Sequence, residues 1–199
     1  VNSKSSVVYM QLAGARSRQD NQKGAEAALL QGLDVLPGDT RLTVALATFY
    51  SQQGELDKAA TVYTSALDAS PDEPRYVLSL AGIRERQQQY EEAITLYEGF
   101  LVKNPDNVIA TNNLAALLAD HRTDEASLNK AKELAGKLAD SNQPALLDTL
   151  GWVHYRVGEY DKAAEVLSGV VEAAPDVPVF RYHLGMAYFK NNQPDKARE

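Results

Sequence analysis

A period of 34 residues runs through the sequence and limits the folds that the chain can adopt. Residues of three types recur at this spacing, with one longer interval of 36 residues between Leu114 and Leu150. They are Pro37, Pro71, Pro105 and Pro175; Ala25, Ala59, Ala93, Ala163 and Ala197; and Leu12, Leu46, Leu80, Leu114, Leu150 and Leu184. A fixed period of this length is the signature of a protein that stacks one supersecondary unit many times.

Each repeat carries the pattern of a helical hairpin. In the second repeat, Leu46 and Tyr50 are four residues apart, and so are Ala59 and Tyr63, as on one face of a helix. Gly54 lies between these two stripes, where a glycine commonly ends a helix. The pattern predicts an all-α fold, an α-solenoid of stacked antiparallel helical hairpins. We expect a single domain over residues 1–199, with repeats at 6–39, 40–73, 74–107, 108–143 and 144–177 and an incomplete repeat at 178–199.

The fourth repeat departs from the period. A polar stretch, residues 119–127, stands where the hairpin turn belongs, and the apolar stripe starts again at Ala131. We expect about four residues added to the turn and about two removed from the end of the second helix. The segment Thr123–Glu125 has the composition of a helix N-cap. We interpret the change as a tolerated loop insertion rather than a functional loop.

The repeats resemble those of bacterial tetratricopeptide repeat (TPR) proteins. The match is clearest in the fifth repeat, in Leu147, Leu150, Gly151, Gly158, Tyr160, Ala163, Leu167 and Pro175. The resemblance implies a right-handed superhelix in which the first helix of each hairpin lines a concave groove. Arg16, Arg84 and His154 depart from it, because they replace an aromatic residue of the family pattern.

Composition removes several other classes of function. The net charge of −7 and the pI near 5.0 disfavour nucleic acid, which binds through neutralised phosphates. There is no cysteine, and no histidine pair has the spacing of a helical zinc site, so we predict neither an enzyme nor a cofactor. The apolar stretch 114–119 is too short to span a membrane. The sequence begins at Val1 and stops within a helical pattern, so we expect a fragment of a longer protein.

The candidate site follows from the groove positions that the resemblance supplies. We select those toward the C-terminal end, where large apolar residues gather: Asn112, Asn113, Asp148, Trp152, Tyr155, Arg156, Tyr182, Met186, Phe189 and Lys190. Because Arg156 and Lys190 flank the aromatic rows, we predict a protein or peptide ligand with an apolar anchor and an acidic group. The alternative is that further repeats, outside the sequence, cover these side chains.

Two functions remain open at this point. One is a protein- or peptide-binding adaptor that uses the groove. The other is a structural scaffold or a homo-oligomerisation module. Resemblance to bacterial TPR proteins favours the cell envelope, in an exopolysaccharide or secretion assembly, with the cytoplasm as the alternative.

Overall fold

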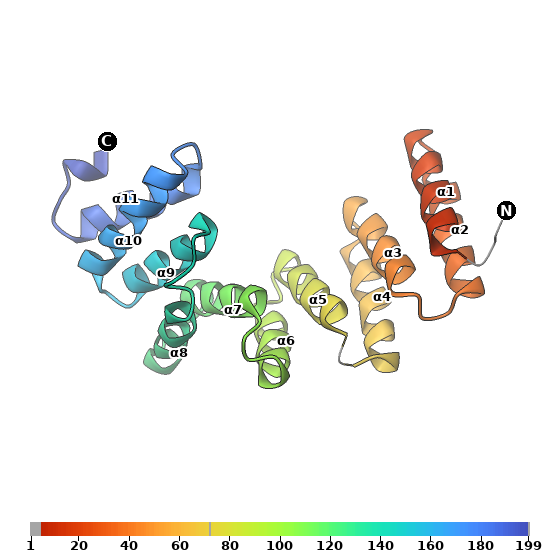
Figure 1. The fold of residues 1–199 in the computed structure, drawn as a ribbon, viewed down its shortest axis with the longest axis horizontal. Helices are drawn as coiled ribbons and strands as arrows, with labels where there is room; N and C mark the ends of the chain where they lie inside the picture. The colour runs from red at the N-terminus through yellow and green to blue at the C-terminus, as the bar shows by residue number, and fades with distance from the viewer. Residues whose placement is uncertain (1–4, 72, 199) are drawn as a thin grey trace. The chain divides into compact units, whose positions relative to one another are not determined.

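The chain folds entirely into helices over the part that its computed structural model describes, residues 5–71 and 73–198. Eleven α-helices and one 3-10 helix follow one another there, without a strand (Figure 1). Their bounds are α1 Ser6–Arg18, α2 Gln22–Val35, α3 Thr40–Gln52, α4 Leu56–Ala69, α5 Pro74–Arg86, α6 Tyr90–Lys103, α7 Val108–His121, α8 Glu125–Gly136, α9 Pro144–Arg156, α10 Tyr160–Ala173, α11 Pro178–Lys190 and η1 Lys196–Arg198. The predicted all-α repeat solenoid is confirmed.

The contacts divide the chain into two compact units, residues 1–96 and residues 97–199. Unit 1 holds α1 to α5 and the first half of α6, and unit 2 holds the remainder. Within each unit, the first helices of neighbouring hairpins contact one another. We call the side that they form the first-helix face: α1, α3 and α5 in unit 1, and α7, α9 and α11 in unit 2. The single domain stays a prediction.

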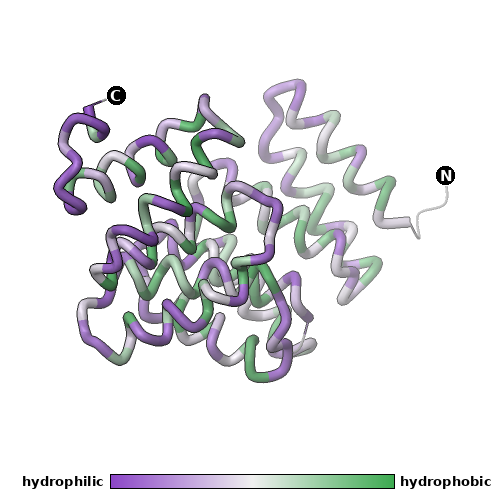
Figure 2. Tube along the Cα trace, turned by 60° about the vertical axis from the view of Figure 1, so that its left-hand side comes forward, coloured by the Kyte–Doolittle hydropathy of each residue, from purple (hydrophilic) through white to green (hydrophobic). Residues whose placement is uncertain are grey.

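Local signals explain where the helices begin and end. The carboxylate of Asp39 accepts hydrogen bonds from the backbone N–H groups of Arg41 and Leu42 and so caps α3. Gly54 has a φ of 79°, a left-handed conformation that lets the chain turn from α3 into α4. Hydrophobic and hydrophilic stretches alternate along the helices, as the amphipathic pattern requires (Figure 2).

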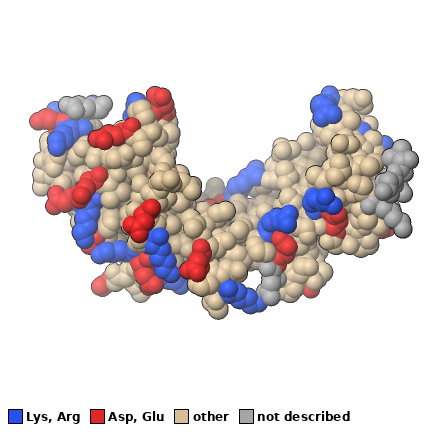
Figure 3. All heavy atoms as spheres, viewed as in Figure 1, with Lys and Arg blue, Asp and Glu red and all other residues tan. Residues whose placement is uncertain are grey.

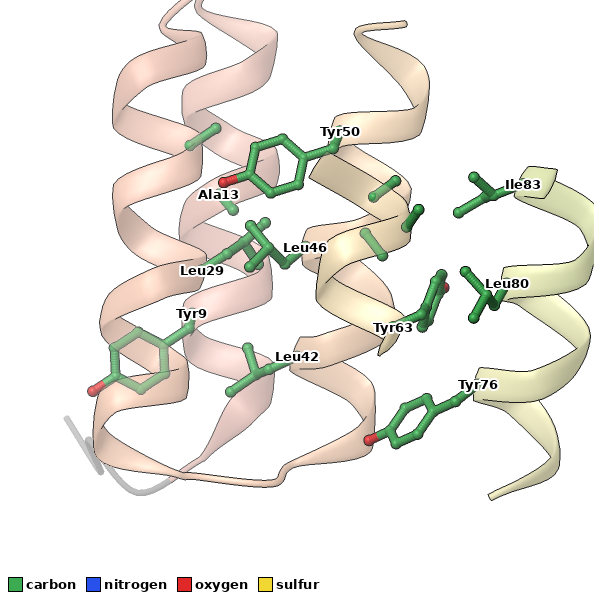
Figure 4. Close-up of a cluster of buried hydrophobic side chains, with 14 of the residues drawn as sticks. Tyr9, Ala13, Leu29, Leu42, Leu46, Tyr50, Tyr63, Tyr76, Leu80 and Ile83 are labelled. Atoms are coloured by element: carbon green, nitrogen blue, oxygen red, sulfur yellow. The ribbon is translucent and has the colours of Figure 1, made fainter. Parts of the chain in front are cut away.

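Apolar stripes from successive hairpins form the core of unit 1. Leu42 and Tyr63 are almost fully buried, and Tyr63 packs against Tyr76 with ring centroids 6.0 Å apart (Figure 4). Ala47, which has no exposed surface, lies at the position where every repeat carries alanine or glycine. A small side chain at this position lets two helices pack closely. This close packing explains why alanine or glycine recurs there in every repeat.

Unit 2 shows the same constraint in a stricter form. A Cβ atom on Gly151 of α9 would lie 2.5 Å from Cγ of Leu167 on α10. Leu167 has no exposed surface and cannot move aside. Only glycine therefore fits at this point.

The irregular fourth repeat corrects one expectation. The connection between α7 and α8 is residues 122–124, three residues long, like residues 53–55 between α3 and α4. The buried Ala131 comes six residues into α8, whereas Ala59 comes three residues into α4. The added residues therefore lengthen α7 and the start of α8 instead of the turn. The predicted cap is confirmed, because Asp124 accepts a hydrogen bond from the backbone of Ser127.

The three replacements of the family aromatic also have a structural role. Arg16 donates to the backbone oxygen of Gly24 at 2.7 Å, and Arg84 pairs with Glu92 at 2.9 Å. His154 contacts Glu159 at 2.7 Å. In each case a polar side chain on the first helix binds the start of the following helix.

Candidate functional site

The predicted site residues all lie on first helices of unit 2, as the sequence indicates. Asn112 and Asn113 belong to α7, the next four residues to α9, and the last four to α11. Their exposure differs widely. Tyr182 and Phe189 are 60% and 62% exposed, whereas Asp148 is only 8% exposed. The surface that a partner meets is therefore made mainly by α11.

Trp152 lies at the centre of a group of stacked rings. Its ring stacks on Tyr155 with centroids 4.7 Å apart and on His183 with centroids 4.2 Å apart. Tyr182 adds a tilted contact at 6.5 Å. We call Trp152, Tyr155, Tyr182 and His183 the aromatic cluster. Trp152 is half-buried and not enclosed within its own hairpin, so it remains a candidate for contact with a partner.

Met186 and Phe189 follow Tyr182 along the same helix. They lie four and seven residues after it, so the three side chains share one side of α11. Met186 is half-buried and Phe189 is exposed. Lys190, also exposed, is the next residue. This side of α11 therefore ends in the aromatic ring of Phe189, next to the cation of Lys190.

The buried carboxylate of Asp148 is held by the neighbouring repeat. His183 Nδ1 lies 2.9 Å from one carboxylate oxygen and 3.0 Å from the other. Asp148 therefore links α9 to α11. It belongs to the candidate site because of its groove position, although its side chain is buried. Sequence reasoning did not predict this pair; the only signal was that both residues occupy groove positions in adjacent repeats.

Asp120, a groove position outside the predicted set of site residues, joins α7 to the cluster. It accepts a hydrogen bond from Trp152 Nε1 at 2.7 Å, and Arg156 lies 3.5 Å from the same oxygen. The Arg156 side chain is 23% exposed, so this cation is partly enclosed and already has a partner. Lys190 is the more accessible cation of the predicted pair.

The two asparagines bring polar groups to the same face. Asn113 donates to the hydroxyl of Tyr97 at 2.9 Å, and Asn112 donates to Asn113 at 3.2 Å. The side-chain oxygen of Asn112 is buried and accepts no hydrogen bond. A buried side-chain oxygen without a hydrogen-bond partner is uncommon in folded proteins.

Glu159 supports α9 from outside the candidate site. Lys132 donates to it at 2.6 Å, and His154 and Lys162 lie 2.7 and 3.4 Å from its oxygens. The Lys132 hydrogen bond, helped by those of His154 and Lys162, lowers the pKa of Glu159 from 4.5 to about 2. One carboxylate thus connects α8, α9 and the start of α10.

These features define an α-helical repeat protein with an aromatic surface on one row of helices. Family comparison identifies the class more closely: a tetratricopeptide repeat model matches residues 17–83 and 154–199, and a second tetratricopeptide repeat model matches residues 78–142. The first of these covers more than half of the chain, which therefore belongs to the TPR family.

One curated relative is a TPR repeat-containing protein of Pseudomonas aeruginosa. It is 37% identical over 81 residues, which are 40% of this chain and 13% of that protein. The chain thus spans only a small part of the length of this relative.

Solved structures confirm the fold. A TPR protein from Parabacteroides merdae superposes with a TM-score of 0.79 at 17% identity, covering 97% of this chain and 76% of that one. PilW, described as a type IV pilus biogenesis factor, gives 0.75 at 18% identity and covers 97% and 89%. Pseudomonas aeruginosa pilF gives 0.72 at 20% identity and covers 97% and 87%. At these identities the likeness concerns the fold alone.

Among the described residues, no helix combines the length and the hydropathy that crossing a bilayer requires.

Proposed function

We propose that this chain is a non-enzymatic adaptor that binds a protein or peptide on the first-helix face of unit 2. TPR folds bind protein partners, and the family consists in general of scaffolds without catalytic activity. The observation that carries the finer proposal is the exposure of two aromatic side chains of α11: Tyr182, in the aromatic cluster, is 60% exposed, and Phe189 is 62% exposed. Exposed aromatic groups on a supported surface are typical of an interaction site.

The side chains favour a particular ligand chemistry. Tyr182, Met186 and Phe189 offer an apolar surface for an anchor residue, and Lys190 offers a charge for an acidic group. Stacking and the hydrogen bond to Asp120 hold Trp152 in place before binding, which lowers the entropy that association costs. The ligand is therefore a peptide segment with an aromatic or large aliphatic anchor next to a carboxylate.

A selection from a random displayed peptide library against the intact chain tests the proposal. We expect the selected peptides to lose affinity by about tenfold or more with Trp152→Ala and with Phe189→Ala. Phe189 is exposed, so its variant keeps its fold even if Trp152→Ala loosens α9. Val102→Ala is the matched control, because Val102 is 83% exposed on α6 and outside the site. Equal affinity for Phe189→Ala and the wild type would contradict the proposal.

A structural scaffold or homo-oligomer is the second candidate, and one observation favours it. Leu12 is 37% exposed, although Leu46 and Leu80 at the same repeat position are buried. Val7 and Leu30 add exposed apolar surface nearby, on α1 and α2. A second copy covering this surface would make the molar mass in solution rise with concentration, which light scattering measures directly. A constant monomer mass would count against this candidate.

A role in an envelope assembly is part of the proposal for the whole protein. It is supported by the likeness of the fold to PilW, which is described as a type IV pilus biogenesis factor. Fractionation of cells that express the full-length protein tests it, and recovery only in the cytosol would contradict it.

A further inference from the structure

One titratable side chain of the aromatic cluster has no role in the proposed function. His183 is the sixth residue of the last repeat, and it binds Asp148, the fifth residue of the repeat before. The equivalent pairs in the earlier repeats are Met10 and Ala45, Val44 and Ser79, Leu78 and Asn113, and Asn112 and Thr149. None of these side chains carries a titratable group. The stacking of hairpins therefore does not require a histidine–carboxylate pair at this point.

The contacts of His183 fix a hydrogen on one ring nitrogen. Nδ1 lies 2.9 and 3.0 Å from the two carboxylate oxygens of Asp148. An ionised carboxylate only accepts hydrogen bonds, so Nδ1 carries a hydrogen, and Nε2 is the acceptor of the neutral ring. A further proton therefore binds at Nε2. Among the described residues, none forms a hydrogen bond with this nitrogen.

The ring of His183 is mostly buried and stacked. Its side chain is 14% exposed, and the ring stacks on Trp152 with centroids 4.2 Å apart and an interplanar angle of 20°. The exposed part gives solvent access to the imidazole. Proton uptake preserves both contacts, because an imidazolium is a stronger donor to Asp148 and a cation is attracted to the face of an indole ring. The proton thus changes the charge of His183 without moving the side chain.

The charged groups near His183 come from α7 and α9. Asp148 of α9 binds it directly, and Asp120 of α7 and Arg156 of α9 lie 3.5 Å apart beside the aromatic cluster. Tyr182 precedes it on α11, with ring centroids 5.8 Å apart, and a tyrosine is uncharged in the neutral pH range. With a neutral His183, two carboxylates and one guanidinium give this group a net charge of −1.

The other elements packed on α11 present apolar or partnered groups to it. Helix α10 contributes apolar side chains, which are Ala163, Ala164 and Leu167. Its Asp161 accepts a hydrogen bond from Asn191, and Lys196 of η1 lies over the ring of Tyr188. Figure 3 shows acidic and basic side chains interspersed over the visible side of unit 2, at the left. A single proton on His183 is therefore a large part of the local charge.

We propose that His183 is a proton switch that raises the affinity of the unit 2 face for an acidic ligand as the pH falls. Histidine is the side chain that ordinarily changes charge between about pH 5 and 8. Above this range, the group around His183 carries its net −1 and repels a ligand carboxylate. Below it, the proton on Nε2 brings the sum to zero and adds an N–H donor, so the exposed Lys190 attracts the acidic group unopposed. The effect on binding rests on the proposed function, whereas the proton site does not.

Nitrogen-15 NMR of the histidine rings tests the proton site in the intact chain without a ligand. The chain has three histidines, so the signals that disappear in His121→Gln and His154→Gln leave those of His183 assigned in the wild type. We expect the Nδ1–H form at pH 8 and proton uptake at Nε2 as the pH falls to 5. A free imidazole prefers the Nε2–H form, so that form at pH 8 would overturn the proposal. Absence of proton uptake above pH 5 would overturn it as well.

Quenching of Trp152 fluorescence tests the charge that the proton brings. Trp152 is the only tryptophan, iodide is an anionic quencher, and acrylamide is a neutral one. We expect the ratio of iodide to acrylamide quenching to rise about twofold from pH 8 to pH 5.5, because a positive charge beside the ring attracts iodide. His183→Gln, which keeps a donor for Asp148, should abolish the rise. His154→Gln should retain it, since His154 binds Glu159 outside the cluster. An equal rise in His183→Gln would overturn the proposal.

Binding measurements separate the switch from the proposed function. Library-selected peptides that contain an acidic residue should bind about threefold more tightly at pH 5.5 than at pH 8, and His183→Gln should remove this difference. Equal affinity at the two pH values would overturn the coupling of the proton to binding. If Phe189→Ala leaves the affinity unchanged while NMR and quenching give the expected results, only the proposed function is overturned.

Discussion

The two units present different chemistry on equivalent helices. The first helices of unit 1 carry a net charge of +5 and an open apolar groove. Those of unit 2 carry three cations and two aspartates, net +1, and rings that already stack on one another. In unit 2, Asp120 is hydrogen-bonded to Trp152, and Asp148 is hydrogen-bonded to His183. Repeat positions that pack the hairpins are fixed, whereas positions on the first-helix face are free to differ.

The difference also concerns how each face is held. Polar contacts from Asp120 to Trp152 and from His183 to Asp148 link α7, α9 and α11. In unit 1, Arg86 of α5 donates to the backbone oxygen of Ser51 of α3, but an apolar groove between α1 and α3 is left open. Unit 2 is therefore the more preorganised surface, and unit 1 the more accessible one.

Substitutions of two glycines should have opposite effects in the two units. Gly151→Ala should destabilise unit 2 by about 1–3 kcal/mol, because its Cβ would lie 2.5 Å from the buried Leu167. Gly82→Ala should stabilise unit 1 by about 1 kcal/mol, since nothing lies within 4 Å of its Cβ and alanine favours a helix. Urea unfolding measures both. A stabilising Gly151→Ala would contradict the close packing.

Ala47→Leu extends this test to unit 1. Ala47 is fully buried at the same repeat position as Gly151, so the larger side chain should cost about 1–3 kcal/mol by overpacking. An unchanged unfolding curve would mean that the repeat register is wrong.

Amide hydrogen exchange should distinguish α11 from α7 within unit 2. Helix α7 buries seven residues, whereas α11 buries only Phe180 and Ala187. We expect exchange in α11 to be faster by about ten- to a hundredfold, since local opening costs less where fewer side chains are packed. Equal protection would show that a second copy or a partner covers α11.

Removal of His183 should loosen the aromatic cluster. His183→Ala leaves the buried Asp148 without its partner, and we expect a loss of about 1–2 kcal/mol. Ser79→Ala, at the equivalent repeat position of unit 1, is the matched control. In a double-mutant cycle with Asp148→Ala, the losses should not add. Strict additivity would show that the contact contributes nothing.

Acid should weaken unit 2 through Glu159. Its pKa in the folded chain is about 2, below the ordinary 4.5, so it stabilises the fold above about pH 4.5 and loses that effect as the pH falls toward 2. Glu159→Gln should cost about 1 kcal/mol at pH 7 and less at pH 3. Glu55→Gln, at the same repeat position in unit 1, should cost less than about 0.5 kcal/mol, because Glu55 has a single exposed partner. Similar losses for both variants at pH 7 would contradict the role of Glu159.

Much of the fold was predictable because the same residue types recur at the same positions in successive repeats. Spacing of Leu, Ala and Pro gave the hairpins, and Gly54 marked a turn that the structure confirms. The fourth repeat was harder. Polar residues 119–127 suggested a longer turn, but helix continuation satisfies more backbone groups, so the added residues became helical.

The candidate site was predictable only as a set of positions. Repeat numbering put all ten residues on first helices, but it could not show which side chains already form hydrogen bonds or ion pairs within the protein. The pairing of Asp148 with His183 and of Arg156 with Asp120 depends on contacts between repeats. The groove of unit 1 has the same cause, since Met10 and Phe49 line it from different repeats.

Intrinsic fluorescence gives the most direct test that a partner binds the first-helix face of unit 2. Trp152 is the only tryptophan, so its emission reports on the aromatic cluster alone. A peptide selected against the intact chain should change this emission as it binds, and Phe189→Ala should weaken that change about tenfold or more. Saturable binding that leaves the emission of Trp152 unchanged and is not weakened by Phe189→Ala would contradict the account.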